Sequence, residues 1–500
     1  MNRSVSYWFI VMFLVIVPFS GCQKYVDVKK NSAQLILETA SDVQLLLDTY
    51  SVMNTGFPSE GMLSSDDFYL RGQIYSAVTN NAEDVGVFRW LSSPRTLALP
   101  QWQTPYQIIF RANLALETVE DLKSSGKDRA ATSATLDALK GAGLFFRAYT
   151  YWNLAQLYAN AYGIASASRD PGIPIRLTSD FNEISNRGTV EGTYARIVQD
   201  LQEAAILLPN IPSVSSRPSK VAAFAMLARV YLSMEDYTNA LSSATAALQI
   251  KNDLFDYNTI SQTQTNPFTR FNKEVLFHSI ILSSPLLSPG SQNSPVAIID
   301  KDLANSYTNN DLRSKIFLKQ NSSPRIDPLT NDYVKNASGV VQFFPDGTFR
   351  FSGNYEPSSS PTQFNGLAVD ELYLIRAECY ARAGNPTQAM TDLNTLLRTR
   401  WLTGTYVDMV ATNAEDALVK VLIERRKELL MRSQRWTDLR RLNRDSRFRK
   451  DLRREIVYDP VPNTVTPAPI YFDLPAGDLR FTLLIPQQVI LNSNLQQNPR

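Results

Sequence analysis

The spacing of apolar residues along the chain predicts a protein dominated by helices. Apolar side chains recur at helical steps in five stretches, at residues 35–50, 102–122, 136–158, 223–250 and 370–401. Between residues 51 and 100 this spacing is lost, and turns alternate with short apolar pieces rich in Ser, Asn, Asp and aromatic residues.

Two of these stretches repeat one scheme. In residues 223–250 and again in 370–401, an aromatic-rich helix is followed by a helix with small residues at close steps. These offsets match the tetratricopeptide pattern, in which small residues let paired helices approach. A third copy is split, with its helices ending near Tyr158 and Leu208. We predict a mainly α fold on a tetratricopeptide-like scaffold, with ordinary helical-bundle packing as the alternative.

Residues 251–369 interrupt the helical pattern. Ser, Asn, Pro, Thr and Gly are dense there, and we expect a loop-rich insert with a few short strands. A structureless insert of this length is uncommon in a compact chain unless it has a function, and binding residues concentrate on loops carried by a rigid scaffold. We therefore expect three regions after the N-terminal segment, at residues 22–250, 251–369 and 370–500.

The N-terminus resembles a bacterial lipoprotein signal. Arg3 precedes an apolar run from Trp8 to Val17, and Ser20 and Gly21 stand directly before Cys22. The run is too short to cross a bilayer comfortably. We predict a signal peptide at residues 1–21 and a lipid anchor on Cys22, although Phe19 stands where the lipobox usually has Leu. A plain secretory signal and an uncleaved anchor are the alternatives.

Composition narrows the possible chemistry. The chain has 50 Lys and Arg against 48 Asp and Glu, a net charge of +2, so no global field indicates a nucleic-acid partner. It has two cysteines and one histidine, His278, which is too few for a disulfide framework or a metal cluster. No phosphate loop, zinc-helix motif or nucleophile elbow is present. We expect no catalytic residues, no metal and no cofactor.

Several segments together resemble the SusD/RagB family of Bacteroidota outer-membrane lipoproteins. The resemblance begins at Cys22 and continues in the family's order to the C-terminus. The segments that resemble the family are GLFFRAYTYWNL at 143–154, DPGIP at 170–174, DLR at 311–313, ELYLIRAE at 371–378, ERRKEL at 424–429, RWTDLR at 435–440 and the ending at 485–499. Two departures, Arg432-Ser433 and Val489, lie in scaffold segments.

This resemblance implies a location and a role. Family members are lipid-anchored on the outer face of the outer membrane, where they cap a TonB-dependent (SusC-like) transporter. They bind oligosaccharides, or peptides in some branches, before import, and they are not enzymes. The resemblance also implies that ligand sites draw on loops from residues 51–100 and from the insert.

Sugar binding needs an aromatic face for the apolar side of the ring and planar polar groups for its hydroxyls. The two loop regions supply both kinds of side chain. We predict six ligand-binding residues: Asp67, Tyr69, Arg71, Trp90, Tyr307 and Arg313.

Three other functions remain open from the sequence. The first is peptide capture by the same family fold. The second is a surface-anchored glycoside hydrolase, although adjacent carboxylates such as Asp66 and Asp67 point opposite ways on an extended segment. The third is a structural adaptor that uses its helical repeats to bind partner proteins.

Overall fold

The computed structural model describes residues 37–78, 82–96, 99–357 and 361–500. The predicted signal peptide, residues 1–21, and the predicted lipid anchor Cys22 lie outside these ranges. The chain divides into Met1–Glu38 and Thr39–Arg500, and the description below concerns the second unit.

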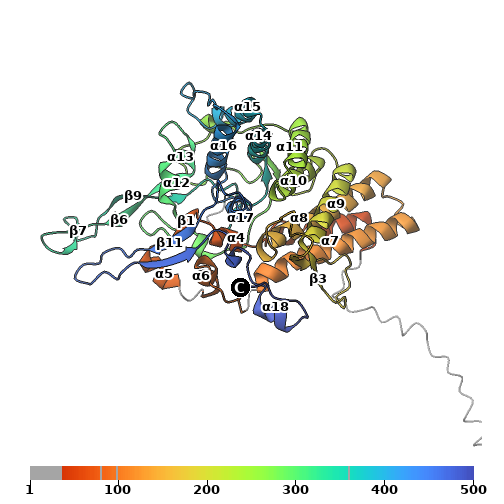
Figure 1. The fold of residues 1–500 in the computed structure, drawn as a ribbon, viewed down its shortest axis with the longest axis horizontal. Helices are drawn as coiled ribbons and strands as arrows, with labels where there is room; N and C mark the ends of the chain where they lie inside the picture. The colour runs from red at the N-terminus through yellow and green to blue at the C-terminus, as the bar shows by residue number, and fades with distance from the viewer. Residues whose placement is uncertain (1–36, 79–81, 97–98, 358–360) are drawn as a thin grey trace, which may run out of the picture. The chain divides into compact units, whose positions relative to one another are not determined.

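Helices are the main regular structure of this unit, which confirms the mainly α prediction (Figure 1). Neighbouring helices pack in succession: α7 on α8, α8 on α9, α9 on α10, α10 on α11, and α11 on α14, which also packs on α15 and α16. The larger helices are α2 (Ala40–Leu47), α7 (Leu99–Ser125), α8 (Ser133–Tyr158), α9 (Val190–Leu207), α10 (Lys220–Ser233), α11 (Tyr237–Ile250), α14 (Val369–Arg382), α15 (Pro386–Arg398), α16 (Ala414–Glu428) and α17 (Arg435–Leu442).

Side chains that cap the helices fix where several of them begin. In each case the capping oxygen accepts the backbone N–H three residues further on, which contributes about 1 kcal/mol per helix. These caps are Thr132 before α8, Thr189 before α9, Ser219 before α10, Asp236 before α11 and Asn413 before α16.

The repeated segments form the predicted helix pairs, α10 with α11 and α14 with α15. Tight turns join the helices of each pair, with Glu235 at φ 62° in one turn and Gly384 at φ 80° in the other. The small residues of the pattern are buried between helices, as Ala240 and Ala377 illustrate. Small side chains therefore permit the close approach that the sequence indicated.

Helix α8 lies at the centre of the N-terminal helices. A Cβ on Gly141 would lie 2.9 Å from the Leu208 side chain, and one on Gly143 would lie 3.0 Å from Leu116. Both separations are shorter than ordinary contact, so glycine at these positions lets the neighbouring chain approach α8 closely. The buried Arg147 of this helix forms a forked pair with Asp200 of α9 at 2.8 Å.

Short helices fill the segment from residue 50 to 100, where the sequence indicated only turns and apolar pieces. The helix expected over residues 35–50 ends at Leu47, and a separate turn follows it. The short helices of the chain are α3 (Tyr50–Met53), α4 (Glu60–Ser64), α5 (Gly72–Ala77), α6 (Ala82–Phe88), α12 (Lys301–Asn305), α13 (Arg313–Ile316) and α18 (Gln487–Leu491).

Short antiparallel strands supply the remaining regular structure. A four-stranded sheet has the order β1-β5-β9-β6, in which Phe68 pairs with Ile299, and Ile298 pairs with Arg350. Its strands are β1 (Phe68–Tyr69), β5 (Ile298–Ile299), β6 (Leu318–Pro324) and β9 (Phe343–Phe351). The two-stranded pairs are β2 (Pro171–Pro174) with β3 (Arg187–Thr189), β4 (Val275–Phe277) with β10 (Leu367–Ala368), β7 (Ile326–Asp327) with β8 (Asp332–Tyr333), and β11 (Leu452–Ile456) with β12 (Ile470–Leu474).

Two β-ribbons extend from the helical body. We call residues 318–351, with β6, β9 and the β7–β8 tip, the first ribbon, and residues 452–474, with β11 and β12, the second ribbon (Figure 1). The amide of Asn331 in the first ribbon donates to the side-chain oxygen of Asn463 in the second, at 3.2 Å. The ribbons therefore lie next to each other although a hundred residues, 352–451, separate them in sequence.

Candidate functional site

A cavity of about 640 Å³ lies where the two ribbons meet the body, and we call it the ribbon cavity. Its walls come from β1, the start of α12, both strands of the first ribbon, and β11 with the residues around it. Its lining residues are Asp66, Phe68, Tyr69, Arg71, Trp90, Asp300, Lys301, Asp302, Ser323, Asp346, Thr348, Lys450, Asp451, Leu452, Arg453, Arg454, Glu455, Val457 and Asp459.

Arg71 links the two ribbons at this cavity. Its guanidinium donates to Ser323 Oγ and Asp346 Oδ2 of the first ribbon, both at 2.6 Å, and to Asp459 Oδ2 of the second ribbon, at 3.2 Å. Burial alone would raise the pKa of Asp346, but hydrogen bonds from Arg71, Ser323 and Thr348 lower this pKa to about 2. Asp346 is therefore ionised at neutral pH, and Arg71 fixes the spacing of the two ribbons.

Tyr69 offers an aromatic ring on the cavity wall. The residue is half-buried, and burial raises the pKa of its phenol to about 12. The Nζ of Lys301 lies 5.7 Å from the centre of the ring, at cation–π distance. Tyr69 therefore combines an apolar face with a neutral hydroxyl. A sugar ring can pack against the face and form a hydrogen bond with the hydroxyl.

Trp90 borders the cavity with a firmly held side chain. Its indole Nε1 donates to the Ser64 carbonyl at 2.9 Å, and the Arg454 guanidinium lies 4.7 Å from the ring centre. Only 3% of the residue is exposed. The indole thus forms part of the wall and is not an open platform for stacking.

Asp67 lies behind the wall and its neighbour Asp66 faces the cavity. Burial raises the pKa of Asp67 to about 6, and its Oδ1 has no hydrogen bond, with the nearest Arg426 nitrogen 3.7 Å away. Burial would also raise the pKa of Asp66, but Arg435 and other nearby cations outweigh it and hold this pKa well below its usual range. Asp66 pairs with Arg435 at 2.6 Å and with Lys450 at 2.7 Å.

The two residues predicted from the insert lie elsewhere, in a buried group of ion pairs. Arg313 is fully buried and pairs with Asp311, Glu424 and Glu428 at 2.8, 2.5 and 3.0 Å. Tyr307 is also buried, and its hydroxyl donates to the Lys427 carbonyl at 2.8 Å. In this structure both side chains join the insert to helix α16, and neither lines the ribbon cavity.

The structure thus brings together three of the six predicted ligand residues, Tyr69, Arg71 and Trp90, and places Asp67 just behind them. Sequence reasoning missed the polar residues contributed by α12 and the two ribbons. Examples are Lys301, Thr348 and Glu455. Nothing in their local sequence separates them from other surface residues, because only the pairing of distant strands brings them to the cavity.

Other reactive groups lie away from this site. His278 is buried, its Nδ1 lies 3.0 Å from the Tyr50 hydroxyl, and burial together with Arg270 lowers the pKa of its imidazole to about 3. Burial raises the pKa of the Cys379 thiol far above its usual value. Within the described ranges, no group of three or more His, Cys, Asp or Glu side chains is arranged to hold a metal ion.

Two segments of the chain, one toward each end, match known protein families. Residues 24–232 match the family described as starch-binding and associating with the outer membrane, and residues 369–500 match the family described as the SusD family. The chain belongs to the SusD/RagB family. Among the helices that the structure describes, none has both the length and the apolarity needed to cross a membrane.

Relatives and solved structures agree with this assignment. Two relatives from Formosa agariphila are SusD-like protein P38, 25% identical over 69% of this chain and 72% of its own length, and SusD-like protein P2, 23% identical over 98% of each chain. A putative sugar-binding protein from Bacteroides vulgatus has a TM-score of 0.67 at 21% identity, covering 93% of this chain and 99% of its own. A laminarin-binding SusD-like protein has a TM-score of 0.61 at 18% identity, covering 91% and 97%.

Proposed function

We propose that this protein captures an oligosaccharide in the ribbon cavity and holds it at the cell surface for import. The observation that carries this proposal is the position of Tyr69, whose half-exposed ring stands among donors and acceptors on a cavity wall. Lys301 and Lys450 supply donors there, and Asp302 and Glu455 supply acceptors. Because each sugar hydroxyl both donates and accepts, a wall with both kinds of group suits it.

The family relationship supports the same ligand class. One structural neighbour is described as laminarin-binding and another as a putative sugar-binding protein. We extend glycan binding from those proteins to this chain as part of the proposal. Capture of a peptide in the same cavity is the alternative within the family, and the panel described below separates the two.

We propose binding without catalysis. A glycosidase acid needs a carboxyl group that keeps its proton near neutral pH. Within the ribbon cavity, Asp66 and Asp346 have pKa values lowered by neighbouring cations and hydrogen bonds. Asp67, whose pKa burial raises to about 6, does not line the cavity. Asp66 and Asp346 therefore suit hydroxyl binding better than proton donation.

The proposal includes a location and a partner. A lipid on Cys22 would tether the protein to the outer membrane, facing the cell exterior, next to a SusC-like TonB-dependent transporter. Tethering raises the effective concentration of bound glycan at the transporter, so modest intrinsic affinity is sufficient. Release into the transporter would then deliver the oligosaccharide for import.

A binding panel tests the proposal. The chain without residues 1–21 is titrated calorimetrically with laminarin, other oligosaccharides and a peptide library. We expect glycan binding that Tyr69→Ala weakens by about tenfold, which corresponds to about 1.4 kcal/mol of lost contact. Tyr333→Ala is the matched control, because Tyr333 is a partly exposed tyrosine of the first ribbon that does not line the cavity. Binding of peptides and of no glycan would contradict the proposal.

A further inference from the structure

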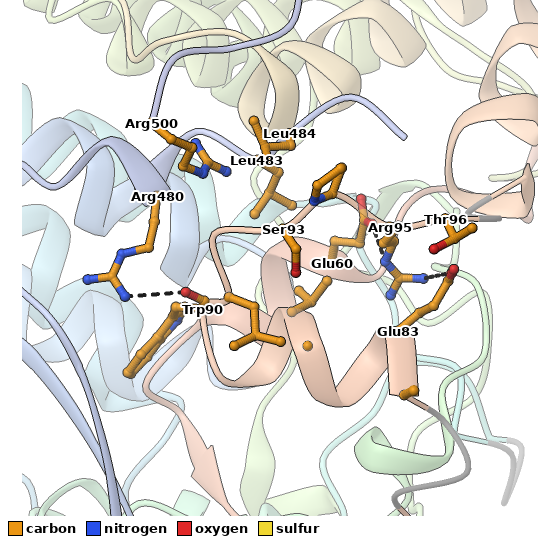
Figure 2. Close-up of a pocket in the computed structure, with 15 residues that line it drawn as sticks. Glu60, Glu83, Trp90, Ser93, Arg95, Thr96, Arg480, Leu483, Leu484 and Arg500 are labelled. Carbon is orange, nitrogen blue, oxygen red and sulfur yellow. Dashed lines mark hydrogen bonds and ion pairs between the residues drawn. The ribbon is translucent and has the colours of Figure 1, made fainter. Parts of the chain in front are cut away.

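A second, smaller cavity of about 200 Å³ lies beside the ribbon cavity, and we call it the C-terminal cavity. Its lining comes from Glu60, from the segment between α6 and Thr96, and from Arg480, Leu483, Leu484 and Arg500 near the C-terminus (Figure 2). The view shows Trp90 and Arg480 on one side and Glu60, Glu83 and Arg95 on the other, with Ser93 between them.

Trp90 lines both cavities and so forms a wall that they share. Its backbone has φ 56°, which is uncommon for a bulky side chain and turns the chain sharply after α6. Its carbonyl accepts a hydrogen bond from Arg480 Nη1 at 3.3 Å, and its indole binds the Ser64 carbonyl on the opposite side. This strained turn is thus fixed at the point where the two cavities adjoin.

The arginine side chains that line the C-terminal cavity are bound to protein partners. Arg95 pairs with Glu60 at 2.7 Å, Asp84 at 2.5 Å and Glu83 at 3.6 Å, so its charge is compensated. Arg480 pairs with Asp478 at 2.7 Å. Arg500, which also lines the cavity, donates to the backbone carbonyls of Leu479 and Thr482. These three guanidinium groups are therefore already bound to protein partners.

Other groups on the lining are suited to a neutral polyol. Ser93 and Thr96 are exposed hydroxyl residues, and Leu91 and Leu484 supply apolar surface beside them. Hydroxyls, fixed planar polar groups and a small apolar surface are together what one pyranose ring needs.

We infer that the C-terminal cavity is a second sugar subsite, which takes a further unit of the same oligosaccharide chain that enters the ribbon cavity. The inference rests on the proposed function and adds to it a ligand longer than the ribbon cavity alone would hold. Trp90 is a positioning residue in this arrangement, because it lines both cavities.

Gly86 offers a way to fill this cavity with little change elsewhere. It lies in α6 on the cavity lining, and a Cβ there would first meet Leu91 Cδ1 at 3.5 Å, an ordinary contact. Gly86→Leu should therefore place a side chain in the cavity without backbone strain. Gly188→Leu is the matched control, because Gly188 lies in β3, lines neither cavity and has nothing within 4 Å of an added Cβ.

The test compares short and long ligands. Disaccharides and hexasaccharides of the laminari-, cello-, xylo- and manno- series are titrated against the wild-type chain and both variants, after thermal unfolding has shown that each variant is folded. We expect the wild type to bind the hexasaccharide of at least one series more tightly than the disaccharide. Gly86→Leu should remove most of that gain, about tenfold or more, while disaccharide affinity stays unchanged and Gly188→Leu behaves as the wild type.

Other outcomes count against specific claims. Unchanged hexasaccharide affinity in Gly86→Leu would overturn the second subsite while leaving glycan capture in place. Failure of the wild type to bind any series, with peptide binding retained, would contradict the proposed function and this inference together. If Gly86→Leu does not fold, Ser93→Trp replaces it, because Ser93 is exposed and a large side chain there would block the cavity from its open side.

Discussion

At the scale of single residues, the molecule separates two kinds of polar side chain. Tyr69 lines the ribbon cavity with a half-buried side chain, whereas Arg71 binds protein partners through its guanidinium. The sequence could show that tyrosine and arginine side chains suit sugar binding, but it could not show which protein groups bind the same side chains. Arg71 has partners in both ribbons, so its effect on a ligand should be indirect, through the shape of the cavity.

Arg71→Ala tests this view. The variant leaves the carboxylates of Asp346 and Asp459 close together without the cation that joins them. We expect faster hydrogen exchange in both ribbons, residues 318–351 and 452–474, together with weaker glycan binding. Arg71→Lys should recover only part of both effects, because a lysine lacks the fork that reaches several partners. Exchange rates in the ribbons equal to those of the wild type would show that Arg71 does not link them.

Asp67 provides a test by pH. Burial raises the pKa of its carboxyl from 3.8 to about 6. The folded protein then binds this proton more tightly than the unfolded chain, so this group lowers stability as pH rises from about 4 to 6. Asp67→Asn should remove that dependence and gain roughly 2–3 kcal/mol in relative stability between pH 4 and pH 7. Chemical unfolding at several pH values measures the free energy of unfolding of both proteins. If the difference between the two free energies does not change with pH, the raised pKa of Asp67 is contradicted.

At the scale of elements, the helices could be predicted from the sequence, because each one buries a single face and its apolar residues therefore recur at helical steps. Residues 223–250 and 370–401 form α10–α11 and α14–α15 as expected. The strands could not be predicted in this way. β1 and β5 have two residues each, and their pairing of Phe68 with Ile299 depends on where the helical body places the two segments. Such short pairs are stabilised by tertiary contacts and have little pattern of their own.

The same reason explains the placement of Arg313. The sequence predicts Arg313 as a ligand residue of the loop-rich insert, but Asp311 and Arg313 pair with each other and with α16 in the interior. A single sequence gives the charges without the partners that neutralise them. Two of the predicted ligand residues, Tyr307 and Arg313, therefore join elements in this structure.

Arg313→Ala measures this role. Removing one partner leaves Glu424, Glu428 and Asp311 buried with less compensation, so we expect a loss of about 3–5 kcal/mol in the free energy of unfolding. Lys335→Ala is the control, because its exposed pair with Asp332 should contribute less than about 1 kcal/mol. Denaturant unfolding compares the two variants. Unchanged stability together with lost glycan binding in Arg313→Ala would restore the original interpretation of Arg313 as a ligand residue.

At the scale of the whole molecule, the motifs spread from residue 22 to 499 were enough to indicate the family, and the matches at both ends confirm it. The cavity was less predictable, because its walls come from segments near residues 66–71, 300–302, 323–348 and 450–459. Only the complete fold brings these segments together. The second ribbon supplies six of the nineteen lining residues, and no local sequence feature indicated it.

The predicted lipid anchor is tested on the complete chain. Cys22→Ser should move the protein from the membrane fraction to the released fraction, because the acyl chains proposed on Cys22 supply the attachment. Cys379→Ser is the matched control, because Cys379 is buried within α14 and should have no part in attachment. Cell fractionation measures both. Membrane retention of Cys22→Ser would contradict the lipid anchor.

The most direct test of the central claim is a crystal structure of the chain, without residues 1–21, bound to the oligosaccharide that ranks highest in the panel. We expect sugar density in the ribbon cavity, with one ring against Tyr69 and hydroxyls within hydrogen-bond distance of residues from α12 and the second ribbon. Sugar bound at another surface, with the ribbon cavity empty, would contradict it.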